Sequence, residues 1–471
     1  MNFLHAEWIR ARGSMLWWLA GAGLLVGVLL TLFALAGNVE TATNLLYPQG
    51  LLVTGMAAPA AALFAGLAET RERDARGGGT LWRPVSPMRT RAARIVVVWL
   101  ALAAFVAFDF VVPFAAGLVF NLDNTASIAL VGLFVWLGML GPAGLAAAAT
   151  RRIGILPTII LGFAFTIGLG YFAERDWWWI NPGAWPTRLA LPTMGLHFNL
   201  LPLDATDPMA GESPIPALTL TLLLAAIGFV VAALVPPRTR PILRRRRVHH
   251  VTAPLATSPA TPRPETTGYV AAVKGVAMAA RVSSISVLLL LTALVLLFSL
   301  AYPVDVREAL FAYAILPVGA GVLPTLVWPK LRPAWALMQV EHTHVRAALA
   351  TWCVGVVALV CAFGAAVVGD ARFGLLAFLA GSVLALTALA ITVRFGVAWT
   401  LATTILVTIV SATIGGDVLA QSALWILAVP AWPITATGAR VWIAAAVGLA
   451  LLAVVVAALM RVLRGMRPVR R

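Results

Sequence analysis

The chain has 471 residues, of which 61% are hydrophobic and 11% charged, and its formal net charge is +16. Soluble domains are about 25% charged and about 45–50% apolar, so this composition excludes an ordinary soluble protein. Apolar runs of about 20 residues recur along the whole length and do not alternate, which predicts membrane-spanning helices and excludes a barrel.

Twelve such runs in chain order predict an all-α polytopic membrane protein. The first six runs are Met15–Gly37, Gly50–Ala68, Ile95–Phe120, Ala126–Ala149, Ile155–Phe172 and Ala217–Val235. The second six are Ile285–Tyr302, Ala309–Trp328, Ala347–Val368, Gly374–Val393, Val397–Ile414 and Val441–Leu459.

Each set of six is preceded by a short amphipathic stretch, MNFLHAEWIRARGS in one case and Tyr269–Ser284 in the other. Both stretches predict a helix lying in the membrane interface, and the first lacks the pattern of a cleavable signal peptide. Residues 236–268 are rich in Pro, Thr and Arg, which predicts a flexible cytoplasmic linker. The predicted organisation is therefore a six-helix half at 1–235, this linker, and a second six-helix half at 269–471.

The basic residues predict the orientation in the membrane. With a cytoplasmic N-terminus, only five of the 34 Lys and Arg residues lie outside, namely Arg175, Arg188, Arg307, Arg372 and Arg440. Positive charge gathers on the cytoplasmic side of membrane proteins, so both termini are expected in the cytoplasm, with the chain in the plasma membrane. The same distribution explains the net charge without a nucleic-acid partner, and Arg244–Arg247 is expected to contact membrane lipid headgroups.

A tryptophan-rich motif occurs twice, as WWWINPGAWP beginning at Trp177 and as LWILAVPAWP beginning at Leu424. Other landmarks repeat in the same order, among them the short turns RRIG (Arg151–Gly154) and RFG (Arg394–Gly396). The order predicts two parallel six-helix repeats, related by an axis near the membrane normal and enclosing a central pathway.

This topology resembles that of the ABC-2 type permease, the membrane subunit of many ABC exporters, along nearly the whole chain. The segment AETRERDARGGGTLWRPVSPMRTRAAR, Ala68–Arg94, carries the closest likeness. It has an acidic residue after the second span, then glycines, then Arg-Pro-Val-Ser-Pro, then basic residues leading to the third span. The chain departs from the common pattern because two permease halves are fused. The second such segment, Pro329–Arg346, is also shorter and less charged.

The resemblance implies that both segments dock on separate ATP-binding subunits, two copies for one fused permease. The implied coupling residues are Glu69, Arg71, Arg73, Arg83, Pro84, Arg89, Lys330, Arg332 and Glu341. The chain has no Gly-x-x-x-x-Gly-Lys-[Ser/Thr] motif, so ATP and Mg²⁺ are expected in the partner, with no cofactor on this chain. It is then not an enzyme itself, and it exports an amphipathic or hydrophobic substrate such as a small peptide.

Other residues predict sites more weakly. Asp109 lies deep in the third span, where a carboxylate is costly, and is assigned either to the translocation pathway or to a structural contact. Four tryptophans are candidates for an external gate or for the interfacial aromatic belt, with shaped non-helical backbone beside them: Trp179, Trp185, Trp425 and Trp432. No metal site is predicted, since the paired histidines do not share a helical face.

Two alternative functions remain. The external carboxylates Glu174 and Asp176 fit a lipid-linked glycosyltransferase, although such enzymes usually place their key acid in the first external loop, where only Glu40 occurs. A secondary transporter is the third hypothesis, based on one intramembrane acid.

Overall fold

The computed structural model describes residues 2–37, 39–74, 86–204, 206–237, 268–280, 283–341, 344–415 and 418–465. Within these ranges the chain is helical, and the one extended pairing is an isolated bridge between Leu196 and Pro202. The chain forms two compact units, Met1–Arg240 (unit 1) and Pro241–Arg471 (unit 2), divided within the segment predicted as linker. Residues 238–267 of that segment lie outside the described residues.

Ten helices in the described part of the chain are long and apolar enough to cross a membrane, which confirms a polytopic α-helical fold. Unit 1 contributes Met15–Leu35, Leu52–Arg73, Pro87–Val119, Ala126–Ile153, Ile155–Glu174 and Ile215–Leu234. Unit 2 contributes Val304–Leu331, Val345–Val368, Ala371–Phe395 and Arg440–Gly465. The other two predicted spans coincide with shorter apolar helices, Leu288–Ser299 and Trp399–Gly415.

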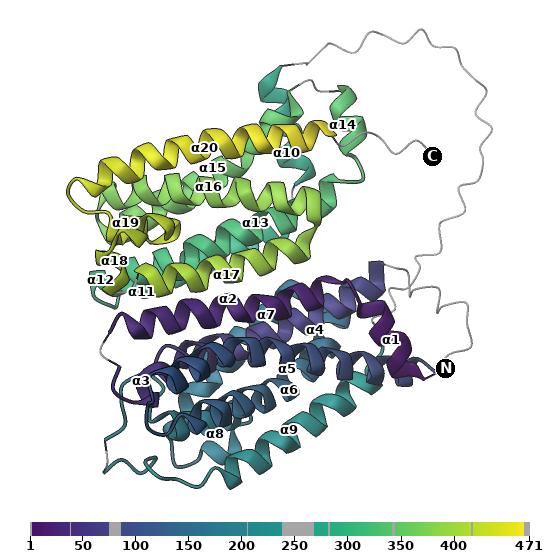
Figure 1. The fold of residues 1–471 in the computed structure, drawn as a ribbon. Helices are drawn as coiled ribbons and strands as arrows, with labels where there is room; N and C mark the ends of the chain where they lie inside the picture. The colour runs from purple at the N-terminus through teal and green to yellow at the C-terminus, as the bar shows by residue number, and fades with distance from the viewer. Residues whose placement is uncertain are drawn as a thin grey trace. The chain divides into compact units, whose positions relative to one another are not determined.

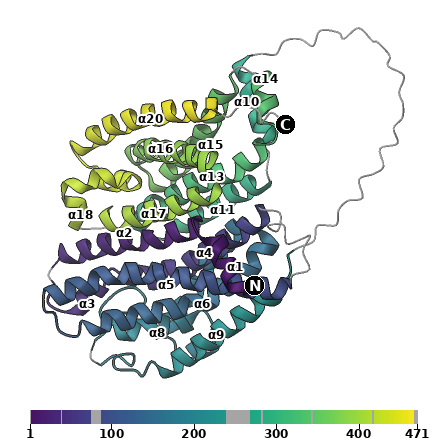
Figure 2. The ribbon, with the colours of Figure 1, turned by 45° about the vertical axis from the view of Figure 1, so that its right-hand side comes forward.

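Unit 1 is a bundle whose long helices lie side by side (Figures 1 and 2). Its helices are α1 (Phe3–Ala11), α2 (Met15–Leu35), α3 (Ala42–Leu46), α4 (Ala57–Asp74), α5 (Pro87–Val119), α6 (Ala126–Ile153), α7 (Ile155–Phe163), α8 (Ala184–Met194) and α9 (Ile215–Leu234). The π-helical turn η1 (Leu52–Met56) precedes α4, and the turns η3 (Ala164–Leu169), η4 (Gly170–Glu174) and η5 (Trp178–Ile180) join α7 to α8. α2 packs on α5, α4 on α6 and α7, and α6 on α9.

Glycines allow the helices of unit 1 to approach closely. A Cβ atom at Gly23 or Gly27 of α2 would overlap backbone carbonyl oxygens of α5, and one at Gly144 of α6 would overlap the backbone of Gly228 in α9. Membrane helices associate largely through such close packing of small residues, because lipid tails leave little hydrophobic drive between helices. These four glycines therefore fix two of the helix contacts in the bundle.

Unit 2 is a second helical bundle, and α16 has contacts with most of its other long helices. Its helices are α10 (Tyr269–Ala279), α11 (Ser283–Ser299), α12 (Val304–Leu310), α13 (Leu316–Leu331), α14 (Trp335–Glu341), α15 (Val345–Val368), α16 (Ala371–Phe395), α17 (Val397–Gly415), α18 (Val418–Gln421), α19 (Trp432–Thr435) and α20 (Arg440–Gly465). The π-helical turn η6 (Phe311–Ile315) precedes α13, and η7 (Ala423–Leu427) and η8 (Val429–Ala431) precede α19. α16 packs on α13, α15, α17 and α20.

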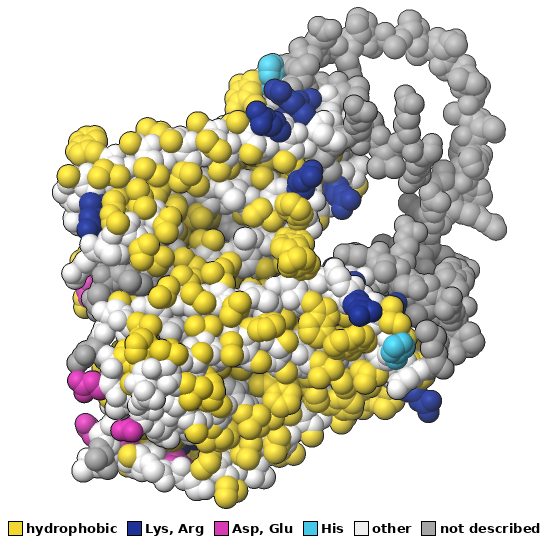
Figure 3. Space-filling view, in the orientation of Figure 1, with side chains coloured by type: hydrophobic (Ala, Val, Ile, Leu, Met, Phe, Trp, Pro, Cys, Tyr) yellow, Lys and Arg dark blue, Asp and Glu magenta, His cyan; other side chains and the backbone are white. Residues whose placement is uncertain are grey.

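Each unit has two distinct ends. The arginine-rich end of unit 1 holds α1 and the facing ends of α4, α5, α6 and α9, and its tryptophan-rich end holds α3, η5 and α8 (Figure 1). In unit 2, α10 and α14 lie at one end, whereas α12, α18 and α19 lie at the other (Figure 1). Figure 3 shows acidic side chains gathered at the tryptophan-rich end of unit 1 and basic side chains at its opposite end.

Candidate functional site

An ion-pair network fills the arginine-rich end of unit 1, with Glu69 at its centre. Glu69 lies in the last turns of α4 and is 7% exposed. Its two carboxylate oxygens accept hydrogen bonds from Arg94 Nη1 of α5 at 2.9 Å and from Arg151 Nη1 of α6 at 2.7 Å. A buried charge is stable only when it is paired and hydrogen-bonded, so Glu69 joins α4, α5 and α6.

Glu7 extends this network to α1. It is 2% exposed, accepts a hydrogen bond from Arg71 and pairs with Arg10 at 3.2 Å. Glu72 of α4 also pairs with Arg10, at 3.1 Å, and with Arg94, at 3.0 Å. Ion pairs with α4 thus hold α1, the helix predicted to lie in the membrane interface, against the bundle. From the sequence, Glu7 has no predicted role beyond the polar face of an amphipathic helix. The one feature that could have indicated this role is an acidic residue next to the arginines of that helix.

The same end of unit 1 also caps α9. Arg151 Nη2 donates to the carbonyl oxygen of Ala232 at 2.6 Å, and Arg91 Nη1 donates to that of Val235 at 2.8 Å. The last carbonyls of a helix have no partner within the helix and carry a partial negative charge, so arginines here satisfy both needs. The network therefore connects five helices: α1, α4, α5, α6 and α9.

The predicted coupling residues divide between this network and the surface. Glu69 and Arg71 belong to the network, so their side chains are engaged within the chain, while Arg73 and Arg89 are exposed on either side of residues 75–85. Arg83 and Pro84 lie outside the described residues. In unit 2, Lys330 and Arg332 are exposed around the end of α13, and Glu341 is the last residue of α14.

At the end of unit 2 that holds α10 and α14, the buried core is apolar. Trp328 and Trp335 stack edge to face there with ring centroids 5.2 Å apart, and Val276 of α10 packs into the same core as Leu463 of α20. Among the described residues of unit 2 there is one ion pair, between Arg372 and Asp370. It lies at the opposite end of the unit, where α15 joins α16. The two units thus hold their N-terminal helices by different chemistry.

Three of the four predicted gate tryptophans are buried. Trp185 packs with Trp178, Phe134 and Leu224, whereas Trp425 and the fully buried Trp432 pack in unit 2. The interfacial-belt interpretation is therefore wrong for Trp185, Trp425 and Trp432, because their rings are buried in the cores of the two units. Trp179 is 58% exposed.

The prediction of non-helical backbone beside these tryptophans is confirmed at Pro182 and Gly183, which form a turn, and is wrong for Pro186 and Pro433. Trp185 and Pro186 lie in the first turn of α8, and Pro433 lies in α19. Proline is compatible with a first helical turn, where its missing N–H would have no partner. Both tryptophans bond to the carbonyl oxygen six residues earlier, Trp185 Nε1 to Trp179 at 2.9 Å and Trp432 Nε1 to Ile426 at 3.1 Å.

An arginine lies over a buried tryptophan in both units. The guanidinium of Arg188 is 5.6 Å from the ring of Trp178, and that of Arg440 is 5.3 Å from the ring of Trp425. Arg188 Nη1 also donates to the Ala173 carbonyl at 2.9 Å, as Arg440 Nη1 does to Ala420 at 2.8 Å. From the sequence, these two arginines are predicted only to be charges on the external side. The feature that could have predicted these contacts is that each arginine is an isolated cation in an external segment, close to a copy of the repeated tryptophan motif.

Acidic residues shape the loop after α8. Glu174 Oε1 accepts a hydrogen bond from the Phe198 amide at 2.5 Å and lies 3.3 Å from His197 Nδ1. Asp207 lies 3.5 Å from His197 Nε2, and Glu212 pairs with Arg188 at 2.6 Å. These carboxylates hold the loop in place, whereas Asp176 is exposed.

Asp109 is fully buried in α5, between α2 and the turn that precedes η1. Gln49 Nε2 donates to its Oδ1 at 3.4 Å, and the backbone of Asp109 lies directly against Gly27. Asp109 Oδ2 and Gln49 Oε1 are both buried and have no hydrogen-bond partner in the structure. Two acceptors without donors indicate that this pair lacks one proton donor.

Asp109→Asn should therefore be as stable as the wild type or more stable, because the carboxamide brings an N–H donor to a buried place where the carboxylate offers only acceptors. Asp109→Ala should lose about 1–2 kcal/mol, the cost of leaving the Gln49 amide unpaired in the interior. Thermal unfolding of each variant in a mild detergent, followed by circular dichroism, measures these changes in stability. Equal stability of the two variants would contradict this account of the pair.

Comparison of the chain with protein-family models, with curated protein sequences and with solved structures finds no match.

Proposed function

We propose that the chain is the membrane subunit of an ATP-driven exporter, energised by separate ATP-binding subunits at its arginine-rich end. The observation that carries this proposal is the network around Glu69. It joins both flanks of residues 75–85, the segment that resembles a coupling segment, to α1, α6 and α9. A force applied to the segment reaches these helices directly, because charge pairs link their ends.

The proposal includes twelve spans arranged as two parallel repeats. Its support is a shared order of local features in the two units. A π-helical turn directly precedes the longest helix of the second span, η1 before α4 and η6 before α13. A glycine with φ near +95° follows the fourth span, at Gly154 (φ 94°) and Gly396 (φ 98°). The tryptophan bonds and the arginine contacts described above also recur. The helix packing is also similar. In unit 1, α4 packs on α6 and α6 on α9, and in unit 2, α13 packs on α16 and α16 on α20.

The proposed orientation places the arginine-rich end in the cytoplasm of a cell whose plasma membrane holds the chain, with both termini on that side. The charge separation of unit 1 supports it, since basic residues favour the cytoplasmic side. The substrate class follows from the apolar bundle and is amphipathic or hydrophobic. Transport then proceeds by alternating access as ATP binds and is hydrolysed in the partner.

The test uses the tagged full chain purified from its own host membranes. The expected companion is a chain with a Gly-x-x-x-x-Gly-Lys-[Ser/Thr] motif, identified by mass spectrometry, that gives ATP-dependent export in proteoliposomes. Replacing Arg83 and Arg89 by alanine should reduce the captured companion about tenfold, equivalent to about 1.4 kcal/mol.

Arg175→Ala is the matched control, because Arg175 is exposed at the tryptophan-rich end of unit 1. It should leave capture and transport unchanged. Transport by the chain without nucleotide would overturn the proposal in favour of a secondary transporter. A glycosyl-transfer activity abolished by Glu174→Ala or Asp176→Ala would favour the enzyme.

A further inference from the structure

Asp109 is a fully buried carboxyl group within a membrane-spanning helix, α5. Among the described residues its side chain forms no ion pair, and it accepts one hydrogen bond, from the neutral amide of Gln49. The other two buried carboxyl groups of the described chain, Glu7 and Glu69, are each paired with arginines. An ionised carboxyl group without such a partner is costly in the interior of a membrane protein. Asp109 therefore needs a proton or a cation that the described side chains do not supply.

The ionisable groups of the elements packed against α5 lie away from Asp109. α2, α3 and α9 contain no ionisable residue. Those of α1, α4 and α6 lie at the arginine-rich end together with Arg94, which is fifteen residues from Asp109, or about 22 Å at 1.5 Å per residue. They are His5, Glu7 and Arg10 on α1, Glu69, Arg71, Glu72, Arg73 and Asp74 on α4, and Arg151 and Arg152 on α6, with Arg89, Arg91 and Arg94 on α5 itself.

The opposite end of unit 1 offers Asp109 no charged partner either. Glu40, Tyr47 and Asp123 are exposed there. His197 belongs to the loop that reaches Gly50 through Leu200, and it lies beside Glu174 and Asp207. In the described part of the chain, none of these groups bonds to the Asp109 carboxyl group.

The atoms around this carboxyl group offer acceptors but few donors. Asp109 Oδ2 and Gln49 Oε1 are buried without a hydrogen-bond donor. Pro113, four residues further along α5, has no N–H, so the main-chain carbonyl of Asp109 also lacks its regular helical donor. A bound proton supplies one donor and removes the negative charge at the same time. A buried water molecule supplies donors as well, but it leaves the charge of the carboxylate in the interior.

The contact between α2 and α5 closes the site on one side. A Cβ atom at Gly27 would overlap the carbonyl oxygen of Asp109, and one at Gly23 would overlap that of Phe105. We propose that Asp109 is a proton-binding site, protonated at neutral pH, whose proton is retained by the close packing of α2 on α5. Release of the proton to water requires α2 to separate locally from α5, and the carboxylate that remains then opposes their return.

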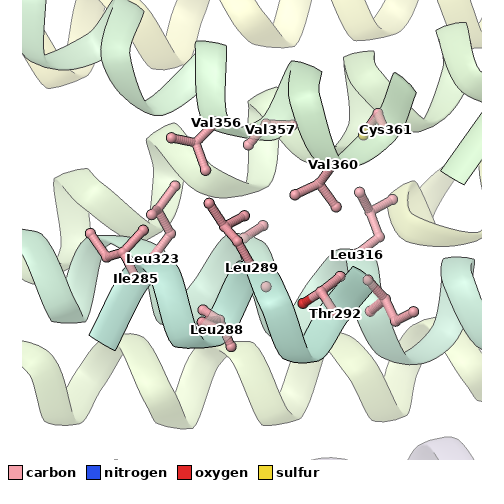
Figure 4. A pocket seen from close by; sticks show the side chains of 13 residues that line it. Ile285, Leu288, Leu289, Thr292, Leu316, Leu323, Val356, Val357, Val360 and Cys361 are labelled. Atoms are coloured by element: carbon pink, nitrogen blue, oxygen red, sulfur yellow. The ribbon is translucent and has the colours of Figure 1, made fainter. Parts of the chain in front are cut away.

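Unit 2 has no counterpart of this site among its described residues. Its third long helix, α15, contains no carboxyl group. Between α11, α13 and α15, Figure 4 shows a cavity with an aliphatic lining, to which Thr292 adds a hydroxyl and Cys361 a thiol. α11, unlike α2, contains no glycine that would bring its backbone close to its neighbours. Within the described chain, the proposed proton site therefore belongs to unit 1.

The test is infrared spectroscopy of the full chain in lipid bilayers at neutral pH. Asp and Glu side chains with ordinary pKa values of about 4 are ionised there, so the C=O band of a protonated carboxyl group should arise from Asp109 and be lost in Asp109→Asn. Gln49→Leu should shift this band to higher frequency, because the carboxyl group loses the hydrogen bond from Gln49. Identical spectra of the wild type and Asp109→Asn would overturn the proposal, since they would show an ionised carboxylate held by water or by a metal cation.

Thr31→Val is the matched control for Asp109→Asn. Thr31 of α2 is also buried, and its hydroxyl has no hydrogen-bond partner. The substitution removes a buried polar group without changing a carboxyl group, so the band should remain.

Retention of the proton is tested by the rate at which the band shifts to lower frequency in heavy water. Gly27→Ala should speed this exchange about tenfold or more, because its Cβ atom forces α2 away from Asp109 and exchange follows local opening. Gly21→Ala should exchange at the wild-type rate, because Gly21 is exposed and an added Cβ meets no atom within 4 Å. Circular dichroism confirms that each variant is folded. Equal exchange rates in the two glycine variants would overturn the role of α2 in retaining the proton.

Discussion

Glu69→Ala should lower the free energy of unfolding of unit 1 by about 3–5 kcal/mol, the usual cost of removing one partner from a buried ion pair. The side chains of Arg94 and Arg151 are only 5% and 6% exposed, and each uses Glu69 as a partner. The variant leaves both guanidinium groups buried next to a missing carboxylate. Denaturant titration of the purified chain in bicelles, followed by circular dichroism, measures the loss.

Asp123→Ala is the control for Glu69→Ala, because Asp123 is exposed in the turn between α5 and α6 and its removal should change stability by less than about 0.5 kcal/mol. The double-mutant cycle of Glu69→Ala with Arg94→Ala should give a coupling energy of about 0.5–3 kcal/mol. A coupling energy near zero would show that this pair does not stabilise the bundle. The network would then be excluded as the link that the proposed function requires.

Gly27→Leu should destabilise unit 1 by about 3 kcal/mol or more, the upper end of the cost of overpacking a tight interior. A Cβ atom at this position would overlap the carbonyl oxygen of Asp109, so α2 must move away from α5. The displacement also disturbs the contact between Asp109 and Gln49. Thermal unfolding in detergent gives the size of the effect.

Gly21→Leu provides the comparison on the same helix. Gly21 is exposed, and an added Cβ meets no atom within 4 Å, so the substitution should change the melting temperature little. Equal melting of the Gly27 and Gly21 variants would mean that the α2–α5 contact is not close-packed in the membrane.

The positions of the long helices were predicted closely from the sequence. Met15 begins both the predicted first span and α2, and Ala126 begins both the predicted fourth span and α6. Gly154 and Gly396 end α6 and α16 where the RRIG and RFG turns were placed. This agreement has a local cause, because each apolar run must satisfy its own backbone hydrogen bonds in lipid and therefore forms a helix by itself.

The site could be predicted only in part. Glu69 and Arg71 were chosen from their place after the second span, and Arg94 ends the same segment. Glu7 and Arg151, however, complete the network from distant parts of the chain. Glu7 and Arg71 are 64 residues apart, and Glu69 and Arg151 are 82 apart. No local pattern specifies such pairs, because they depend on which helix ends meet.

Composition and hydrophobic length by themselves determined the class of the protein, the places of its helices and the charge difference between its ends. Tertiary structure decided which arginines pair with Glu69, that Trp185 and Trp432 lie in the interior, and that α11 leaves an apolar cavity where α2 packs tightly. The physical reason is that burial in lipid acts on each apolar segment separately. Ion pairs, indole hydrogen bonds and close helix contacts, in contrast, arise only where segments distant in sequence come together.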